Sequence, residues 1–218
     1  MSTGEPGTRV ALVTGASGVV ARAIVARLRA DDFLVGGLGG EDAAGDLALA
    51  VDLTDRGQTV AAAERVTSEL GPVSVLVTAP ALHDAAPFGE MDPDRWKRLL
   101  MTHLGGTANA CAAVVPAMVR AGHGTVVTLS SWMALAGIPG EAYYAAATGS
   151  ILAFTKSFAL EVAPKGVRVN CIAVGPLEAT PPNAAVRPIE IADTVAFLVE
   201  DGDFFVGQVL CAAAGAVV

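Results

Sequence analysis

The chain has 218 residues, enough for one domain with a sizeable core, and 53% of them are hydrophobic. Its net charge of −8 argues against nucleic acid and anionic membrane surfaces as partners. Charged residues, glycines and prolines interrupt every apolar run before the roughly 20 residues that span a bilayer, and the polar first residues do not form a signal peptide. These features exclude a membrane protein, and we expect a cytoplasmic one.

Strand-like and helix-like segments alternate along the chain. Short apolar runs predict strands at 9–14, 33–38, 47–51, 73–78, 125–130, 167–173 and 208–211. Helical periodicity and capping signals predict helices at 18–30, 56–70, 92–120, 142–163 and 189–200. Strands that alternate with helices form parallel sheets covered on both faces. The expected fold class is therefore α/β, with a single-domain, doubly wound parallel sheet flanked by helices over residues 1–218.

A serine, a tyrosine and a threonine stand at the spacing of a known type of active site. Tyr144 follows Ser131 by 13 residues, and Thr148 lies one helical turn beyond the tyrosine on the same helix face. In this pattern the chain resembles the short-chain dehydrogenase/reductase family, in which a lysine occupies the third position. Here that lysine is missing, so the three residues form a degenerate version of the family's catalytic group.

The missing lysine has a predictable consequence for the tyrosine. An unperturbed tyrosine has a pKa near ~10, and a cation at about 4 Å favours the ionised form by up to roughly 4 kcal/mol. Thr148 supplies no charge, and Lys156 lies roughly 12 Å further along the helix axis. Tyr144 is thus expected to stay protonated at neutral pH and to assist hydride transfer poorly.

Other segments carry the same resemblance in the family's order. They are the glycine-rich turn after the first strand, the acidic segment at 52–55, the helix-to-strand passage at 156–170, the segment from Gly175 to Thr180, and the last strand. The resemblance implies a Rossmann-like fold and an NAD(P)H-dependent oxidoreductase. It also implies cofactor contacts from Thr14, Gly15, Ser17, Gly18, Asp52, Leu53, Gly175 and Pro176.

The chain departs from the family at the cofactor site. Val19 and Ala21 replace two glycines that let the backbone approach the pyrophosphate. The remaining glycines either bind phosphate or serve turn geometry alone, and the sequence does not decide between these roles. Strand two ends in Gly36–Gly40, without an acidic residue or an arginine for the ribose. The connection between strands two and three is short, as is the substrate lid near 180–188. We therefore expect weak or absent NAD(P)H binding.

His103 stands where the family has a catalytic asparagine. It either forms an acid–base pair with Tyr144 or bonds a nearby backbone carbonyl in place of the asparagine, and the second role is favoured. The other histidines, His83 and His123, lie in loop contexts. Neither the histidines nor the three cysteines have the spacing of metal ligands, so no metal site is expected.

Three functions remain open at this stage. The leading hypothesis is a non-catalytic or accessory subunit that pairs with itself or with an intact ketoreductase paralogue through helices 92–120 and 142–163. The alternatives are an NAD(P)H-dependent ketoreductase with an atypical site, and a non-redox dehydratase, isomerase or cyclase that uses Tyr144, Ser131 and His103. The small residues at 145–150 permit a close helix contact between subunits or equally within the chain. The substrate, the pathway and the choice between NADH and NADPH do not follow from the sequence.

Overall fold

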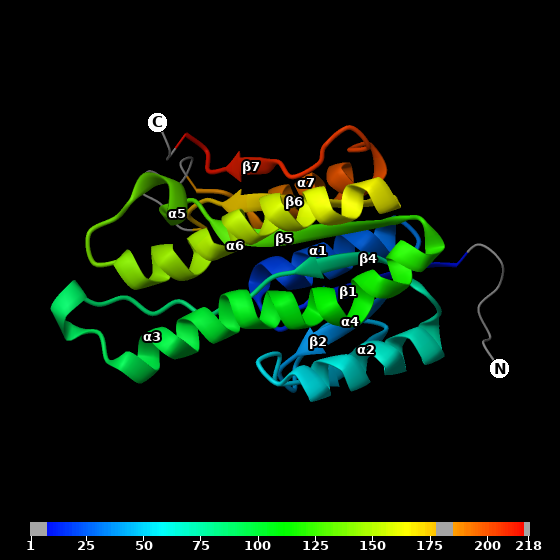
Figure 1. Ribbon diagram of the computed structural model, residues 1–218, viewed down its shortest axis with the longest axis horizontal. Helices are drawn as coiled ribbons and strands as arrows, with labels where there is room; N and C mark the ends of the chain where they lie inside the picture. Colours follow the sequence, from blue (N-terminus) through cyan, green and yellow to red (C-terminus); the bar gives the residue numbers. More distant parts are fainter. Residues whose placement is uncertain (1–7, 178–184, 216–218) are drawn as a thin grey trace.

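The computed structural model describes residues 8–177 and 185–215 and shows one parallel sheet between two layers of helices (Figure 1). The seven strands lie in the order β3-β2-β1-β4-β5-β6-β7, and every neighbouring pair is parallel. The order reverses between β1 and β4, where open sheets of this kind place their ligand sites. The predicted fold class is thus confirmed.

The strands match the apolar runs of the sequence within one or two residues. Their bounds are Arg9–Thr14 for β1, Phe33–Gly39 for β2, Leu47–Ala50 for β3, Val73–Thr78 for β4, Gly124–Ser131 for β5, Val167–Val174 for β6 and Val209–Ala212 for β7. The central strands are buried almost throughout, because helices cover both faces of the sheet. The edge strands β3 and β7 are short and partly exposed.

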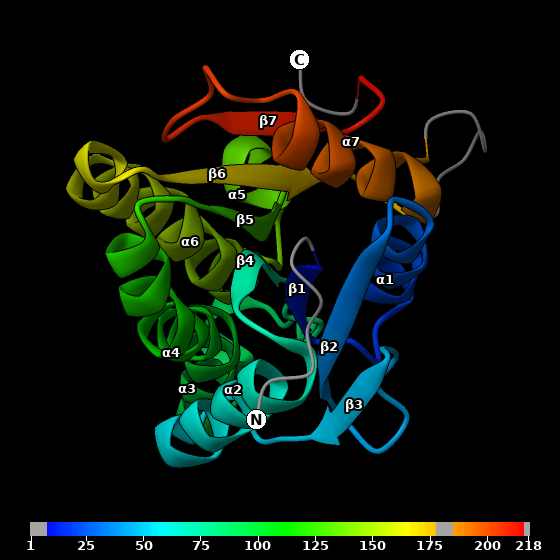
Figure 2. The ribbon, with the colours of Figure 1, turned by 90° about the vertical axis from the view of Figure 1, so that its right-hand side faces the viewer.

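The helices divide between the two faces of the sheet. Figure 2 shows α1 (Val19–Ala30) and α7 (Pro188–Glu200) on one side, and α2 (Arg56–Leu70), α4 (Gly106–Ala121) and α6 (Ala142–Val162) on the other. Each layer buries its own apolar cluster against the sheet. Within the parts that the structure describes, no helix is both long enough and apolar enough to cross a membrane.

The prediction of one continuous helix at 92–120 is wrong in one respect. It begins as α3 (Pro93–Leu100) after the cap Asp92, as expected, but it is interrupted by a π-helical turn, η2 (Met101–Gly105), before α4 continues. A π turn adds a residue to the helix and shifts the face on which the following side chains lie. The turn carries His103 into the interior of the protein, where its side chain is buried.

A shorter helical turn and loops complete the side of the molecule near the carboxyl ends of the strands. The chain between β4 and α3 contains η1 (Phe88–Glu90), and α5 (Met133–Ala136) connects β5 to α6. η3 (Ala163–Lys165) lies at the opposite side, between α6 and the start of β6. The expected shortened lid falls mainly on residues 178–184, which lie outside the described residues.

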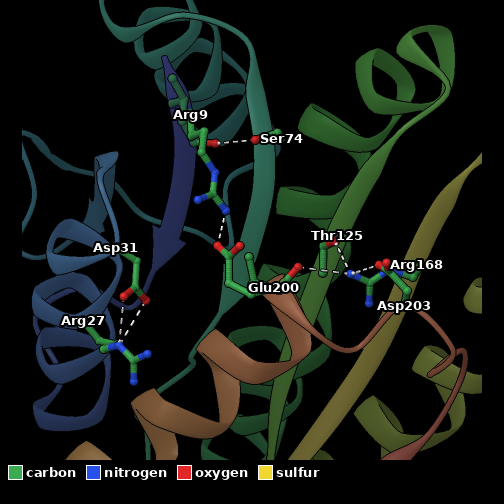
Figure 3. A network of polar contacts seen from close by, with 10 residues as sticks. Arg9, Arg27, Asp31, Ser74, Thr125, Arg168, Glu200 and Asp203 are labelled. Carbon is green, nitrogen blue, oxygen red and sulfur yellow. Dashed lines mark hydrogen bonds and ion pairs between the residues drawn. The ribbon is translucent and has the colours of Figure 1, made fainter. Parts of the chain in front are cut away.

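At the amino-terminal edge of the sheet, a polar network joins β6 to the end of α7 (Figure 3). Arg168 donates hydrogen bonds to the carbonyl groups of Leu198 and Gly202 at 2.9 and 2.8 Å, and to the Thr125 hydroxyl at 3.0 Å. Arg9 pairs with Glu200, the last residue of α7. A guanidinium group that caps carbonyls at a helix end satisfies acceptors that the helix leaves free. This network fixes α7 against the sheet.

Candidate functional site

A cavity of about 360 Å³ opens at the carboxyl ends of the central strands, at the reversal of strand order. The segment 79–83 after β4, the ends of β5 and β6 and the first turn of α1 form most of its wall. The wall is mainly apolar, and its polar members are Ser130, His83, His103, Tyr144 and Thr148. A concave, apolar site with a few converging polar groups is the usual form of a small-molecule site.

Tyr144 lines this cavity, and Ser131 lies near the tyrosine. Tyr144 projects from the first turns of α6, and Ser131 ends β5. The Ser131 hydroxyl accepts a hydrogen bond from the Met133 N–H at 3.2 Å, which fixes the oxygen in place. Burial raises the pKa of Tyr144; the nearby Ser131 side chain opposes this rise, and the negative charge of Glu141 adds to it. The tyrosine is therefore protonated at neutral pH.

Thr148 does not replace the missing lysine. Its side chain is buried, and its hydroxyl donates a hydrogen bond to the Tyr144 carbonyl at 2.9 Å, one turn back in the same helix. This local bond keeps the hydroxyl on the helix backbone rather than on the tyrosine side chain. The Thr148 carbonyl accepts from the Ser130 hydroxyl at 2.8 Å and so joins α6 to β5. Lys156 is exposed and does not line the cavity.

His103 bonds a backbone carbonyl, as the favoured prediction has it. Its Nε2 lies 2.7 Å from the Leu82 carbonyl oxygen, which can only accept, so Nε2 carries the proton. Its Nδ1 is buried without a hydrogen-bond partner. Burial lowers the pKa of His103, which therefore stays neutral at physiological pH. The His103 and Tyr144 rings meet edge to face at 5.5 Å between centroids. This contact is not the hydrogen bond that an acid–base pair needs.

His83 and Glu141 complete the site, and sequence reasoning missed them. The His83 Nε2 lies 3.0 and 3.1 Å from the two carboxylate oxygens of Glu141, which precedes α6. The His83 ring meets the Tyr144 ring edge to face at 4.6 Å between centroids. His83 and Glu141 are 58 residues apart, and His83 lies in a loop that carries no sequence motif. Only the fold brings the two residues to Tyr144.

Some residues of the glycine-rich turn serve the backbone conformation, and one of them lines the cavity. Gly15 has a φ of 66°, and a Cβ there would lie 2.0 Å from the Ala79 carbonyl oxygen, so the turn itself requires glycine. Gly18 caps α1 and lines the cavity. Thr14 is buried at the end of β1, and the Ser17 hydroxyl accepts a hydrogen bond from the Gly40 N–H at 2.9 Å. Of these four predicted cofactor residues, only Gly18 borders the cavity.

The remaining predicted cofactor residues serve local structure. The Asp52 carboxylate accepts from the Thr54 N–H at 2.9 Å, and the Leu53 carbonyl accepts from the Asn109 side chain at 3.0 Å. Gly175 donates its N–H to the Ala212 carbonyl at 2.7 Å, and a Cβ at Gly175 would lie 2.4 Å from the Ala213 Cα. The Pro176 carbonyl accepts from the Val186 N–H at 2.8 Å. None of these four residues lines the cavity.

Val19 and Ala21 differ in their effect on the cavity. The Val19 side chain is 60% exposed at the first helical position of α1 and forms part of the cavity wall. It projects where a bound phosphate would approach the helix N-terminus. Ala21 also borders the cavity, but it is buried and packs in the core between α1 and the sheet. The exposed Val19 side chain therefore affects the approach of a ligand more than Ala21 does.

Sequence comparison agrees with this geometry. Residues 9–190 match the model of the family described as short chain dehydrogenase. The chain belongs to the short-chain dehydrogenase family. It is 33% identical to the acetoacetyl-CoA reductase of Shinella zoogloeoides over 95% of this chain and 98% of that protein. It is 30% identical to the 3-oxoacyl-acyl-carrier-protein reductase of Escherichia coli strain K12, over 88% of this chain and 90% of that protein, and 32% identical to the corresponding reductase of Chlamydia trachomatis over 73% and 72%.

Two larger hollows of this short-chain dehydrogenase differ in character from the candidate site. One, of about 420 Å³, lies at the amino-terminal edge of the sheet beside Arg9 and Arg168, whose donors are already bonded within the protein. The other, of about 630 Å³, is an open apolar groove between α4 and α6. Across the described ranges 8–177 and 185–215, no group of three or more histidine, cysteine or acidic side chains could hold a metal ion.

Proposed function

We propose that this chain is a slow NAD(P)H-dependent ketoreductase acting on 3-oxoacyl thioesters. The observation that carries the proposal is the protonated hydroxyl of Tyr144, which lines an apolar cavity and has the Ser131 side chain near it. Relatives named as acetoacetyl-CoA and 3-oxoacyl-acyl-carrier-protein reductases give the substrate class. The sequence motifs alone favour an accessory subunit, whereas these relatives favour reduction.

The two hydroxyl groups are suited to hold a carbonyl oxygen. Tyr144 is protonated, so its O–H donates a hydrogen bond to the carbonyl oxygen and polarises the C=O bond. The Ser131 hydroxyl, fixed by Met133, supports the same oxygen. As the C=O bond becomes a C–O single bond, the Tyr144 proton moves to that oxygen. The tyrosine then recovers its proton from solvent beside His83, whose side chain is 53% exposed.

The residues that line the cavity fit the nicotinamide half of the cofactor. Bound NAD(P)H supplies the hydride that reduces the carbonyl carbon. Ser130, Val174 and Leu177, which line the cavity together with Tyr144, would hold the nicotinamide end. No lysine holds the ribose or stabilises the ionised tyrosine, because Thr148 is neutral and bonded to its own helix. Slow turnover and weak cofactor binding follow from this loss.

Reduction of acetoacetyl-CoA tests the proposal. Tyr144→Phe removes the proton donor, and we expect turnover to fall by at least about 100-fold, the scale of a lost general acid. Tyr143→Phe is the matched control, because the Tyr143 hydroxyl bonds the Phe88 carbonyl and its ring stacks on Phe88, away from Ser131. Its activity should stay close to that of the wild type. Equal activity of wild type and Tyr144→Phe refutes the assignment.

A second candidate function is assembly as a subunit with itself or with an intact reductase paralogue. The apolar groove between α4 and α6 favours it, because Phe154 and Phe158 stack there at 5.2 Å beside Val115 and Val119. The two helices are those named from the sequence. This role is compatible with slow turnover by the chain itself.

A further inference from the structure

The connection between β2 and β3 lies against the glycine-rich turn. We call residues 40–46 the 40–46 segment. The Gly40 N–H donates to the Ser17 hydroxyl at 2.9 Å, and the Ala44 N–H donates to the Ala16 carbonyl at 3.1 Å. The far end of the segment is tied to β2, because the Asp46 N–H donates to the Val35 carbonyl at 2.7 Å. The segment is therefore anchored to the turn at several points.

An acidic side chain of this segment engages the nearest cation. Arg22, in the first turns of α1, donates to the Ser17 carbonyl at 3.0 Å and to the Asp42 carboxylate at 2.6 Å. Its guanidinium also donates to the Asp42 carbonyl at 2.5 Å. The nearby Ser17 hydroxyl holds the pKa of Asp42 below its usual value. The cation beside the turn is thus already paired with a carboxylate.

The glycines at the end of β2 accommodate this packing. A Cβ on Gly37 would lie 1.8 Å from the Ala44 carbonyl oxygen, and a Cβ on Gly39 would lie 2.9 Å from the Ser17 hydroxyl oxygen. The backbone of the segment therefore occupies the face of β2 next to the turn. Among the described residues, none that lines the cavity comes from the ends of β2 or β3.

This arrangement fills the place where doubly wound folds normally bind the adenosine half of a dinucleotide. In doubly wound folds the adenosine ribose lies at the end of the second strand, beside the glycine-rich turn. Here that place holds the 40–46 segment with its carboxylates Glu41, Asp42 and Asp46. Negative charge at this end opposes the phosphates of a dinucleotide. Val19 adds a branched side chain where the pyrophosphate would approach.

We propose that the chain recognises only the nicotinamide half of its cofactor and takes a nicotinamide mononucleotide as readily as a dinucleotide. The inference rests on the proposed function and names the form of the cofactor. The adenosine half finds no subsite, so it adds nothing to affinity. The additional phosphate of NADPH adds nothing either, because Arg22 is held by Asp42.

Binding titrations test the inference without relying on turnover. Nicotinamide fluorescence is followed while the wild-type chain is titrated into reduced nicotinamide mononucleotide, NADH or NADPH. We expect three dissociation constants within about threefold of one another, all near or above roughly 1 mM. A dissociation constant for NADH or NADPH more than about tenfold below that of the mononucleotide overturns the inference and leaves the reductase proposal intact. Equal binding without any reduction of acetoacetyl-CoA overturns the proposed function alone. Failure of all three to bind overturns both.

A charge variant tests the role of Asp42. Asp42→Ala releases Arg22, so the dissociation constant of NADPH should fall at least about threefold relative to that of the mononucleotide. Asp203→Ala is the matched control, since it removes another exposed carboxylate paired with an arginine, at the opposite edge of the sheet. Asp203→Ala should leave the ratio of the NADPH and mononucleotide dissociation constants unchanged. If Asp42→Ala also leaves this ratio unchanged, the role assigned to the Asp42 carboxylate is wrong.

Discussion

At the residue scale, position 148 sets the chemistry of the tyrosine. A lysine there would favour the ionised phenol, whereas Thr148 leaves Tyr144 with a raised pKa caused mainly by burial. The sign for stability follows from linkage: the folded state binds the tyrosine proton more tightly than the unfolded chain. Its contribution is complete below the ordinary pKa of 10.0 and is lost as pH rises through the folded value. Around neutral pH the residue acts as a donor.

His103 gives a pH-dependent prediction of the opposite sign. Its folded pKa is lowered from 6.5 by burial, so the unfolded chain takes up the proton first. The free energy of unfolding should be constant above 6.5 and should fall as pH drops through the folded pKa of His103. Urea denaturation of wild type and His103→Asn between about pH 4.5 and 7.5 should show this loss only in the wild type. Identical pH profiles would mean that His103 is not buried in its neutral form.

The site residues differ in how readily the sequence reveals them. Ser131, Tyr144 and Thr148 could be predicted because a fixed spacing on β5 and α6 places them together. The contact of His83 with Glu141 could not, because it joins residues that only tertiary packing brings together. Sequence spacing carries no information on such pairs.

At the element scale, the π turn before α4 and the 40–46 segment are the features near the site that the sequence pattern does not reveal. The sequence predicts helix through 101–105, but nothing in its apolar period reveals the extra residue of a π turn. The run Gly36–Gly40 indicates close packing, yet its partner, the backbone at Ala44, becomes visible only in the fold. Both features shape the site, one by turning His103 inward and the other by closing the end of β2.

The subunit role is also tested at this scale. Gly149, one of the small residues at 145–150, is half-buried and faces Ala134 of α5 in the same chain, with 3.8 Å to an added Cβ. Ala112, exposed beside the groove between α4 and α6, is the better position. Ala112→Glu should dissociate an oligomer formed through this groove, because a charge cannot be buried there without a partner.

Light scattering measures the outcome of that substitution. Ala26→Glu is the control, because Ala26 is exposed on α1, on the other face of the sheet. An interface that supports a stable subunit role should bury about 2,000 Å² or more. A wild-type chain that is monomeric at high concentration would refute the subunit role and leave the reductase proposal unaffected.

At the scale of the whole molecule, the fold is predictable because its patterns repeat. Seven apolar runs separated by helical segments allow few arrangements other than a parallel sheet with helices on both faces. The cores on the two faces are continuous, and the polar network of Arg168 fastens α7 at the edge away from the cavity. The candidate site lies at the carboxyl ends of the strands, away from this network.

Transfer of deuterium tests the central claim most directly. Wild-type protein is incubated with acetoacetyl-CoA and a nicotinamide cofactor, reduced mononucleotide or NADH, that carries deuterium in place of both C4 hydrogens of the ring, and the product is analysed by mass spectrometry. We expect 3-hydroxybutyryl-CoA with deuterium on C3 from the wild type and from Tyr143→Phe, and at least about 100-fold less from Tyr144→Phe. Product without deuterium, or no product from the wild type, would contradict the account.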